Sequence, residues 1–261
     1  MAFFMGILDT CVTMFLFPRL LASSRLWAAC ALLLLGACAT PPAPQPAPEQ
    51  AAFDLSSSSQ ASWKPLHLPG KRKTQYTHAT HEGRLAVLAT ANSSVSMFRR
   101  AVRIPADELG LLTFSWKVPG LIQTADMAQR ELDDSPVRLV LAFEGDRSRF
   151  SHKNRMLSEL SHALTGEELP YATLMYVWCN QCKAGDVIVN PRTDRIRKMS
   201  VESGSGNLGR WLDYQRDIRA DFIKAFGEEP GALTGIALMT DTDNTQSKAT
   251  AWYGPVSLKA K

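Results

Sequence analysis

Residues 84–259 consist largely of short apolar segments, separated by turn-forming residues such as Pro119-Gly120 and Asp243-Asn244. In some segments two sets of residues alternate, as Arg138, Val140 and Ala142 do with Leu139, Leu141 and Phe143. Such runs are typical of β-strands that bury one or both faces. Strands are therefore predicted at 84–91, 94–104, 111–118, 137–145, 174–178, 186–190, 197–202, 234–241 and 249–259.

Two segments have helical spacing instead. Residues 153–164 carry apolar side chains three to four positions apart, and Gly166 follows as a stop signal. Residues 212–226 carry apolar side chains four positions apart up to Phe226, with Gly227 behind them. Because strictly alternating β-α-β units are absent from this pattern, the sequence favours a mainly β fold, a β-sandwich with two inserted helices, over a parallel α/β fold.

The N-terminal region has the composition of an export signal. Arg25 precedes the apolar run 26–35, which is shorter than the roughly 20 residues that a membrane-spanning helix needs. The box Leu35-Gly36-Ala37-Cys38 resembles the lipobox of bacterial lipoproteins. That resemblance implies cleavage before Cys38 and lipidation of Cys38, and Ala39 behind it implies an outer-membrane lipoprotein facing the periplasm. An uncleaved anchor helix starting near Met14 is the alternative, and translation starts at Met1 or Met14.

The expected organisation is a signal peptide over residues 1–37, a tether over 38–62 and one domain over 63–261. The tether is rich in Pro, Ala and Ser, so it can bury little. The formal net charge is +4, and basic residues are interspersed with acidic ones except at 71–73 and 192–198. Both clusters are interpreted as surface loops, and nucleic acid is not an expected partner.

A set of motifs along the chain resembles an exported-protein family known only as domain of unknown function 3047. They include Phe114–Val118, Asp133–Arg138, Leu174–Trp178, Trp211–Gly227 and Gly235–Thr245. The resemblance covers about residues 63–258 and implies a bacterial envelope protein of jelly-roll shape with no established activity. The end of the chain is also similar to carbohydrate-binding modules and galactose-binding-like domains.

Acidic residues are the first candidates for a functional site. Asp241, Asp243 and Asn244 place oxygen atoms on one turn, as a Ca²⁺ ion would require, although Asp and Asn are also common turn residues. Asp133 and Asp134 precede a predicted strand, and an Asp134–Arg138 ion pair is an alternative to a binding or catalytic role. Paired carboxylates could instead hydrolyse a glycan, if the fold set them at a catalytic distance.

Cys179 and Cys182 lie three residues apart at the tip between two predicted strands. The oxidising environment of the envelope favours a structural disulfide. The alternatives fit less well. A redox pair requires a helix that follows it, and haem attachment requires a histidine at the position of Lys183. A zinc site requires two more ligands.

Aromatic residues form a second candidate site. Trp252 and Tyr253 are neighbours in one predicted strand, so their side chains point to opposite faces, and one of them is expected outside or in a groove. Trp178 is expected to be exposed beside the cysteine turn. Flat aromatic rings suit sugar rings, although aromatic residues in strands are usually part of the core.

These features predict an envelope-anchored lipoprotein whose domain binds a glycan or another envelope component without catalysis. A polysaccharide hydrolase or lyase that uses paired Asp residues is one alternative. A scaffold or assembly partner with an apolar patch is the other. Calcium is the one cofactor that the sequence suggests.

Overall fold

The computed structural model describes residues 50–53 and 63–259. The predicted signal peptide, Cys38 and most of the predicted tether lie outside the described residues. Residues Pro46–Lys261 form one compact unit, which contains every described helix and strand. Strand β1 (Gln50–Phe53) falls within the segment predicted as a tether and pairs with the end of the last strand.

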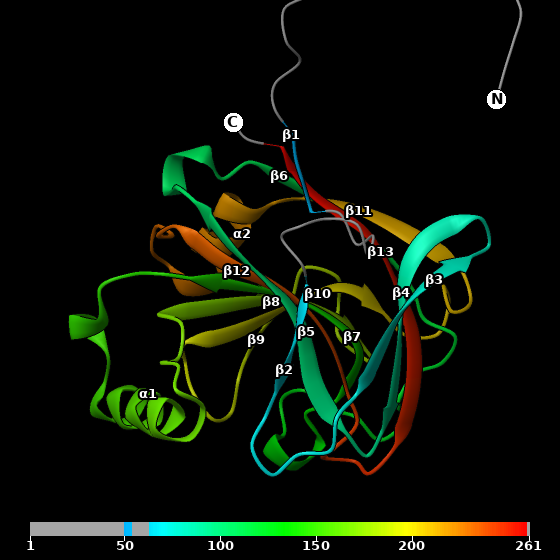
Figure 1. Cartoon of the computed structure of the whole chain (residues 1–261), viewed down its shortest axis with the longest axis horizontal. Helices are drawn as coiled ribbons and strands as arrows, with labels where there is room; N and C mark the ends of the chain where they lie inside the picture. Colours follow the sequence, from blue (N-terminus) through cyan, green and yellow to red (C-terminus); the bar gives the residue numbers. More distant parts are fainter. Residues whose placement is uncertain (1–49, 54–62, 260–261) are drawn as a thin grey trace, which may run out of the picture. The chain divides into compact units, whose positions relative to one another are not determined.

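The unit is built from two β-sheets (Figure 1). The first sheet has the order β11 (Trp211–Asp217), β6 (Leu111–Lys117), β13 (Lys248–Lys259), β4 (Arg84–Asn92) and β3 (Gln75–His81), with β1 beside β13. The second sheet has the order β2 (Lys64–His67), β5 (Val95–Ile104), β12 (Leu233–Asp241), β7 (Ser135–Phe143), β8 (Ala172–Cys179), β10 (Ile196–Ser203) and β9 (Val187–Val189).

Eight of these strands give the fold its class. The first sheet contains the antiparallel set β11-β6-β13-β4, and the second contains the antiparallel set β5-β12-β7-β8. The chain passes repeatedly from one sheet to the other along this set, which is the strand arrangement of a jelly roll. The parallel pairing of β10 with β8 lies outside it. The predicted mainly β, jelly-roll-like sandwich is confirmed.

The main apolar core lies between the two sheets. Alternate residues of each central strand point into it, among them Trp116 and Tyr253 from the first sheet and Leu139, Tyr176 and Trp178 from the second. A second apolar cluster lies on the opposite, outer face of the second sheet and includes Val140, Met175 and Met239. Because β7, β8 and β12 are apolar on both faces, they read in the sequence as continuous apolar runs.

Helix α1 (His152–Thr165) lies outside the two sheets (Figure 1), whereas α2 (Ile218–Phe226) packs Ile218 and Phe222 into the main core. Short 3₁₀ turns occur at Ala106–Glu108, Arg130–Leu132 and Arg147–Arg149. None of the described helices is long and apolar enough to cross a bilayer.

Two sequence predictions are wrong. The segment 212–226 is not one helix, because strand β11 occupies its first part and α2 starts only at Ile218, where Asp217 caps the helix. Trp178 is fully buried rather than exposed, since its side chain points between the sheets. Strands β2, β3 and β11 were not predicted. They are rich in polar residues and contain no fully buried position, so their sequences show no alternation of apolar and polar residues.

Candidate functional site

The predicted acidic residues meet a pair of cations on the outer face of the second sheet. Arg138 on β7 donates to the side chain of Asp133 at 3.0 Å and to Asp241, on neighbouring β12, at 3.2 Å. Lys198 on β10 binds the other oxygen of Asp133 at 2.6 Å. All four side chains are at most 4% exposed. They form a buried quartet of two carboxylates and two cations. The predicted Asp134–Arg138 ion pair is wrong, because Arg138 pairs with Asp133 and Asp241 instead.

Burial and mutual contact shift the protonation of the quartet. Burial raises the pKa of Asp241 to about 7, against the opposing effect of Arg138. Burial also acts to raise the pKa of Asp133, but Arg138 and Lys198 together hold it below its usual value. Burial, together with the nearby Arg138, lowers the pKa of Lys198 to about 8. A pKa of about 7 would suit Asp241 to general acid–base catalysis, but all four side chains are at most 4% exposed, so a substrate cannot reach them.

Asp134 organises the acidic turn that follows β12. Its carboxylate accepts hydrogen bonds from the backbone N–H groups of Asn244 and Thr245, at 3.2 and 2.7 Å, and from the Thr245 hydroxyl at 2.6 Å. Asp243 is ion-paired with Lys71. The Asn244 amide donates to the Asp133 carbonyl and to Asp134. The oxygens that were predicted as calcium ligands are therefore divided among different protein partners.

No cluster of three or more His, Cys, Asp or Glu side chains suited to a metal ion occurs among residues 50–53 and 63–259. The donor set around the turn does not fit Ca²⁺ either. Asp241 faces Arg138, and the Asn244 side chain presents its NH₂ group to Asp133 and Asp134. Hard cations need six or more oxygen ligands directed at one point.

Trp252 and Tyr253 point to opposite faces of the first sheet. Tyr253 is 1% exposed, and its hydroxyl donates to the Met239 carbonyl at 2.7 Å inside the sandwich. Trp252 is half-buried on the outer face. The structure thus separates Trp252 from the Asp133–Asp241 quartet, because the two lie on the outer faces of different sheets.

On the outer face of the first sheet, Trp252 belongs to a row of three side chains. Trp211 on β11 and Trp252 on β13 are both in register with Lys117 on β6, which lies between them. Neighbouring strands are about 4.8 Å apart, so two strand spacings separate the tryptophans. We call Trp211, Lys117 and Trp252 the tryptophan row.

The β3–β4 hairpin turn folds onto this row. His81 stacks on Trp252 with ring centres 4.0 Å apart, Glu82 pairs with Lys117, and the Arg84 guanidinium lies 5.3 Å from the centre of the Trp211 ring. Glu82 and Gly83 both have positive φ, as a two-residue type I′ turn requires. A buried N–H remains: Nε1 of Trp211 has no hydrogen-bond acceptor among the described residues.

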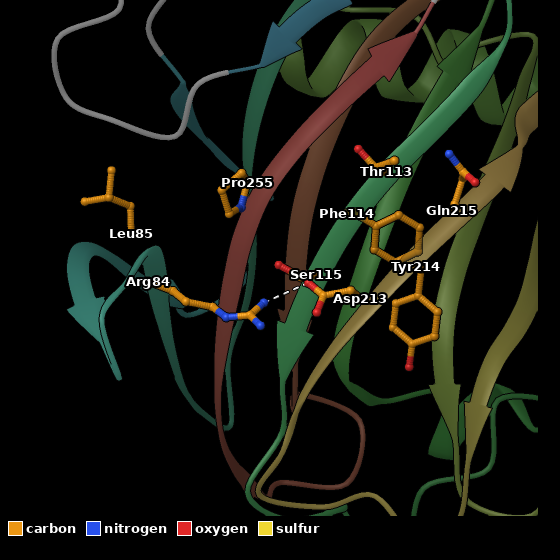
Figure 2. A pocket seen from close by; sticks show the side chains of 9 residues that line it. All are labelled: Arg84, Leu85, Thr113, Phe114, Ser115, Asp213, Tyr214, Gln215 and Pro255. Carbon is orange, nitrogen blue, oxygen red and sulfur yellow. Dashed lines mark hydrogen bonds and ion pairs between the residues drawn. The ribbon is translucent and has the colours of Figure 1, made fainter.

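A shallow hollow of about 620 Å³ lies beside the row, between β6, β11 and the hairpin turn (Figure 2). Hydrogen-bonding side chains surround it: Arg84, Thr113, Ser115, Asp213 and Gln215. Apolar contact surface comes from Pro255 and Leu85, of which Leu85 is 60% exposed. Figure 2 shows Arg84 reaching Asp213 across the hollow, where the two are 2.7 Å apart.

Gly254 lies against this hollow. A Cβ atom at this position would lie 2.0 Å from the Ser115 hydroxyl and 3.4 Å from the Trp211 ring. The pairing of β13 with β6 shifts register here, between Tyr253 and Val256. A residue without a side chain therefore lets β13 pass close to Ser115 while Pro255 turns toward the hollow.

The second sheet has a larger groove of about 890 Å³ on its outer face. Its floor is apolar and includes Met97, Val140, Met175 and Ala237. Residues of α1 and of the segment that follows it, such as Ser161 and Glu167, form its far wall.

Cys179 and Cys182 form the predicted disulfide, with Cα atoms 5.6 Å apart. Within the loop that they close, Asn180 donates to the carbonyls of Ile122 and Ala125 at 2.8 and 3.0 Å. Those carbonyls belong to the 119–134 segment, whose Met127 carbonyl accepts a hydrogen bond from Lys198. The disulfide loop is thus linked through Asn180 to the 119–134 segment, which in turn contacts Lys198 of the quartet.

A scan against protein-family models matches residues 61–257 to the family described as protein of unknown function, DUF3047. The chain belongs to this family. No curated protein matches it. The DUF3047 match covers every described strand except β1 and the last two residues of β13, so both the hollow and the groove are features of a DUF3047 domain.

Solved structures with a similar arrangement of strands include two of a family 11 carbohydrate-binding module from Clostridium thermocellum. One, from the cellulosomal cellulase Lic26A-Cel5E, is 8% identical, with a TM-score of 0.42, and the match covers 82% of this chain and 96% of the module. The other, in complex with a β-1,3-1,4-mixed-linked tetrasaccharide, is 10% identical, with a TM-score of 0.40 and coverage of 81% and 96%.

A third similar structure is the xyloglucanase domain of NopAA, a type three effector from Sinorhizobium fredii, in complex with cellobiose. It is 10% identical, with a TM-score of 0.39, and the match covers 78% of this chain and all of that domain. At these identities and TM-scores, none of the three likenesses bears on what the DUF3047 domain binds.

Sequence reasoning missed most residues of the hollow and the groove. Arg84 lies in the β3–β4 hairpin, whereas Asp213 and Gln215 lie on β11, whose partner β6 is distant in the sequence, and no motif joins the three. A signal was nevertheless present at Gly254-Pro255, because a Gly-Pro pair inside a strand marks a bulge or a close backbone approach.

Proposed function

We propose that this domain binds a glycan at the outer face of its first sheet, without cleaving it. The observation that carries the proposal is the hollow beside the tryptophan row. Donors and acceptors from two neighbouring strands and one hairpin turn converge there around a small apolar surface. A sugar ring offers the same combination, hydroxyl groups at its rim and C–H groups on its faces.

The charges and hydroxyls in the hollow fit this role. Asp213 is 66% exposed in its side chain and Arg84 42%, so both reach solvent while they stay paired. Surface ion pairs of this kind contribute little to stability and can exchange partners with a ligand.

We propose binding without cleavage because of where the acidic side chains lie. Asp133, Asp134 and Asp241 are at most 4% exposed and are held by Arg138, Lys198 or the 243–245 backbone. A glycosidase needs two carboxylates that flank a bond in an open cleft. Burial of these residues therefore argues against the hydrolase alternative that was built on them.

The cell-envelope setting is a proposal from the sequence alone. Residues 25–38 are the basis for placing the protein in the outer membrane as a lipoprotein acylated at Cys38. Metabolic labelling with radioactive palmitate tests this directly: the full chain should become labelled, and Cys38→Ser should abolish the label. An unlabelled wild-type chain would contradict the lipid anchor, and the proposal of glycan binding would be unaffected.

The test of glycan binding uses residues 46–261, the compact unit that holds both sheets and both apolar clusters. Affinity electrophoresis against a panel of soluble polysaccharides should show retardation by at least one of them. Asp213→Ala and Gln215→Ala change exposed positions, so these variants should fold and lose at least about tenfold in affinity, or 1.4 kcal/mol.

Val189→Ala, at an exposed position on the second sheet, is the matched control and should bind as the wild type does. Retardation that is equal in all four proteins would move the site away from the hollow. No retardation by any polysaccharide would count against glycan binding itself.

A further inference from the structure

The groove on the outer face of the second sheet has a floor of small and apolar residues in register. One row across the strands is formed by Ala101, Gly235, Ala142 and Thr173. The next row contains Ala237, Val140 and Met175 in the same strand order, with Arg99 at its β5 end. Because the side chains of the first row are small, the groove is deepest along this row, which crosses four strands.

This floor suits an aliphatic chain better than a sugar. The two aromatic residues at the margin of the groove, Phe143 and Tyr171, are at most 5% exposed and offer no open ring face. Met97 and Met175 contribute flexible side chains that adapt to an irregular apolar partner. The volume of about 890 Å³ is within the range of sites that enclose small apolar ligands.

Helix α1 borders the groove with its polar side. Asn154 and Ser158 are its buried residues, and they bond to Asp194 and Arg147 at 2.7 and 2.9 Å. The apolar stripe of α1 faces solvent: Met156, Leu160 and Leu164 are 54%, 52% and 60% exposed. No residue of α1 belongs to either apolar cluster of the described chain. A few hydrogen bonds, rather than an apolar contact, therefore hold this wall of the groove.

Cations lie at the β2–β5 end of the groove. Lys64 on β2 is in register with Arg99 on β5, and both line the groove. Arg99 also makes a two-armed ion pair with Glu167, which follows α1, so that this pair joins the sheet to the far wall. An anionic group at this end can pair with Lys64 and take the place of Glu167 on Arg99.

We propose that this groove binds a fatty acyl chain with an anionic head group. The chain lies along the small-residue row, and the head lies at Lys64 and Arg99. The proposal is independent of glycan binding, because the two sites are on the outer faces of different sheets. Two sources of such a chain share this chemistry, a free fatty acid and a phospholipid in a bilayer.

The first experiment uses residues 46–261 and 11-(dansylamino)undecanoic acid as the probe. Dansyl fluorescence should rise and shift to the blue on titration, and unlabelled fatty acids should displace the probe. Affinity should rise about fourfold for each methylene added between octanoate and dodecanoate, because burial of a methylene contributes about 0.8 kcal/mol. No fluorescence change, or affinity that does not depend on chain length, would overturn the proposal.

Variants locate the site. Ala101→Trp fills the groove from an exposed position, so the protein should fold and lose at least about tenfold in probe affinity. Thr77→Trp, exposed on the first sheet, is the matched control and should bind as the wild type does. Equal loss in both variants, or in neither, would contradict a site in the groove.

The head-group contact is tested by comparing decanoate with decanol. The double variant Lys64→Gln, Arg99→Gln should weaken decanoate at least about fivefold more than it weakens decanol, which has no anionic head and feels only the loss of the Arg99–Glu167 contact. An equal effect on both ligands would contradict the proposed role of these cations. In Asp213→Ala, fatty-acid binding should be intact, so that failure of glycan binding and failure of this proposal are distinguished.

Binding to vesicles distinguishes a phospholipid in a bilayer from a free fatty acid as the source of the chain. If phospholipid is the source, the fragment should sediment with phosphatidylglycerol vesicles, and the triple variant Met156→Ser, Leu160→Ser, Leu164→Ser should not. Binding of the dansyl probe without vesicle binding assigns the groove to free fatty acids. Vesicle binding that persists while the probe fails to bind would overturn the proposal, since the groove would not then be the site.

Discussion

Arg138 and Asp241 are 103 residues apart in the sequence, and their side chains meet at 3.2 Å on the outer face of the second sheet. Register explains the contact, because β7 and β12 are neighbouring strands. Asp133, just before β7, and Lys198, on β10, complete the quartet. Two carboxylates and two cations thus meet where each side chain is at most 4% exposed.

Truncation of Arg138 should be strongly destabilising. Arg138→Met leaves Asp241 buried without its cation, and removal of one partner of a buried pair typically costs about 3–5 kcal/mol of unfolding free energy. Urea denaturation measures the loss. The double variant Arg138→Met, Asp241→Leu should recover much of it, because no lone charge then remains. A double variant that is less stable than Arg138→Met would contradict this explanation.

Asp241 should make stability fall as pH rises from about 4 to 7. Its pKa is about 7 in the folded protein and near 3.8 in the unfolded chain, so the folded state holds the extra proton in this window. One such proton contributes a slope of up to about 1.4 kcal/mol per pH unit. Urea denaturation at pH 5, 6 and 7 should show a smaller slope in Asp241→Asn than in the wild type, and equal slopes in the two proteins would contradict this assignment.

Asp134→Ala should loosen the turn at 243–247. It removes the acceptor of two backbone N–H groups and of the Thr245 hydroxyl, and unsatisfied buried donors cost about 1–3 kcal/mol each. Thermal unfolding in the presence and absence of millimolar Ca²⁺ checks the role of the turn. The wild-type midpoint should be the same in both, because the turn oxygens already have protein partners. A calcium-dependent rise that disappears in Asp243→Ala would contradict this reading.

Gly254→Ala should be destabilising for a specific steric reason. The added Cβ would lie 2.0 Å from the Ser115 hydroxyl, and overpacking of this kind typically costs about 1–3 kcal/mol. Ser115→Ala removes the clashing atom, so the double variant should be more stable than Gly254→Ala alone. A double-mutant cycle from urea denaturation measures this coupling, and strictly additive effects would show that the close approach is relieved elsewhere.

Loss of the Cys179–Cys182 disulfide should lower the unfolding free energy by about 2 kcal/mol, the chain-entropy value for so short a loop. Cys179→Ser, Cys182→Ser is the variant, with the wild type under reducing conditions for comparison. Because Asn180 in this loop binds the carbonyls of Ile122 and Ala125, hydrogen exchange at the Ala125 N–H, which donates to the Ile122 carbonyl, should become faster in the variant. Unchanged exchange there would confine the disulfide to a local role.

Much of the framework was predictable because it depends on local pattern. Apolar alternation and turn residues located β4 to β10, β12 and β13, and helix α1 was marked at its end by Gly166. The disulfide followed from spacing and compartment, and it is confirmed. The β11–α2 segment was misread because Ile218, Phe222 and Phe226 are helically spaced, whereas the polar strand before them has no pattern of its own.

By itself, the sequence determined the fold class, since alternation with period two leaves few solutions other than packed sheets. Only the tertiary structure decided which residues meet. Strand register set Asp133 and Asp241 against Arg138 and Lys198, and so turned a candidate metal or catalytic set into a buried ion cluster. It also placed Trp211 and Trp252 around Lys117, far from that cluster. The physical reason is that pairing between distant strands is fixed by the packing of the whole sandwich, and no short stretch of sequence contains that information.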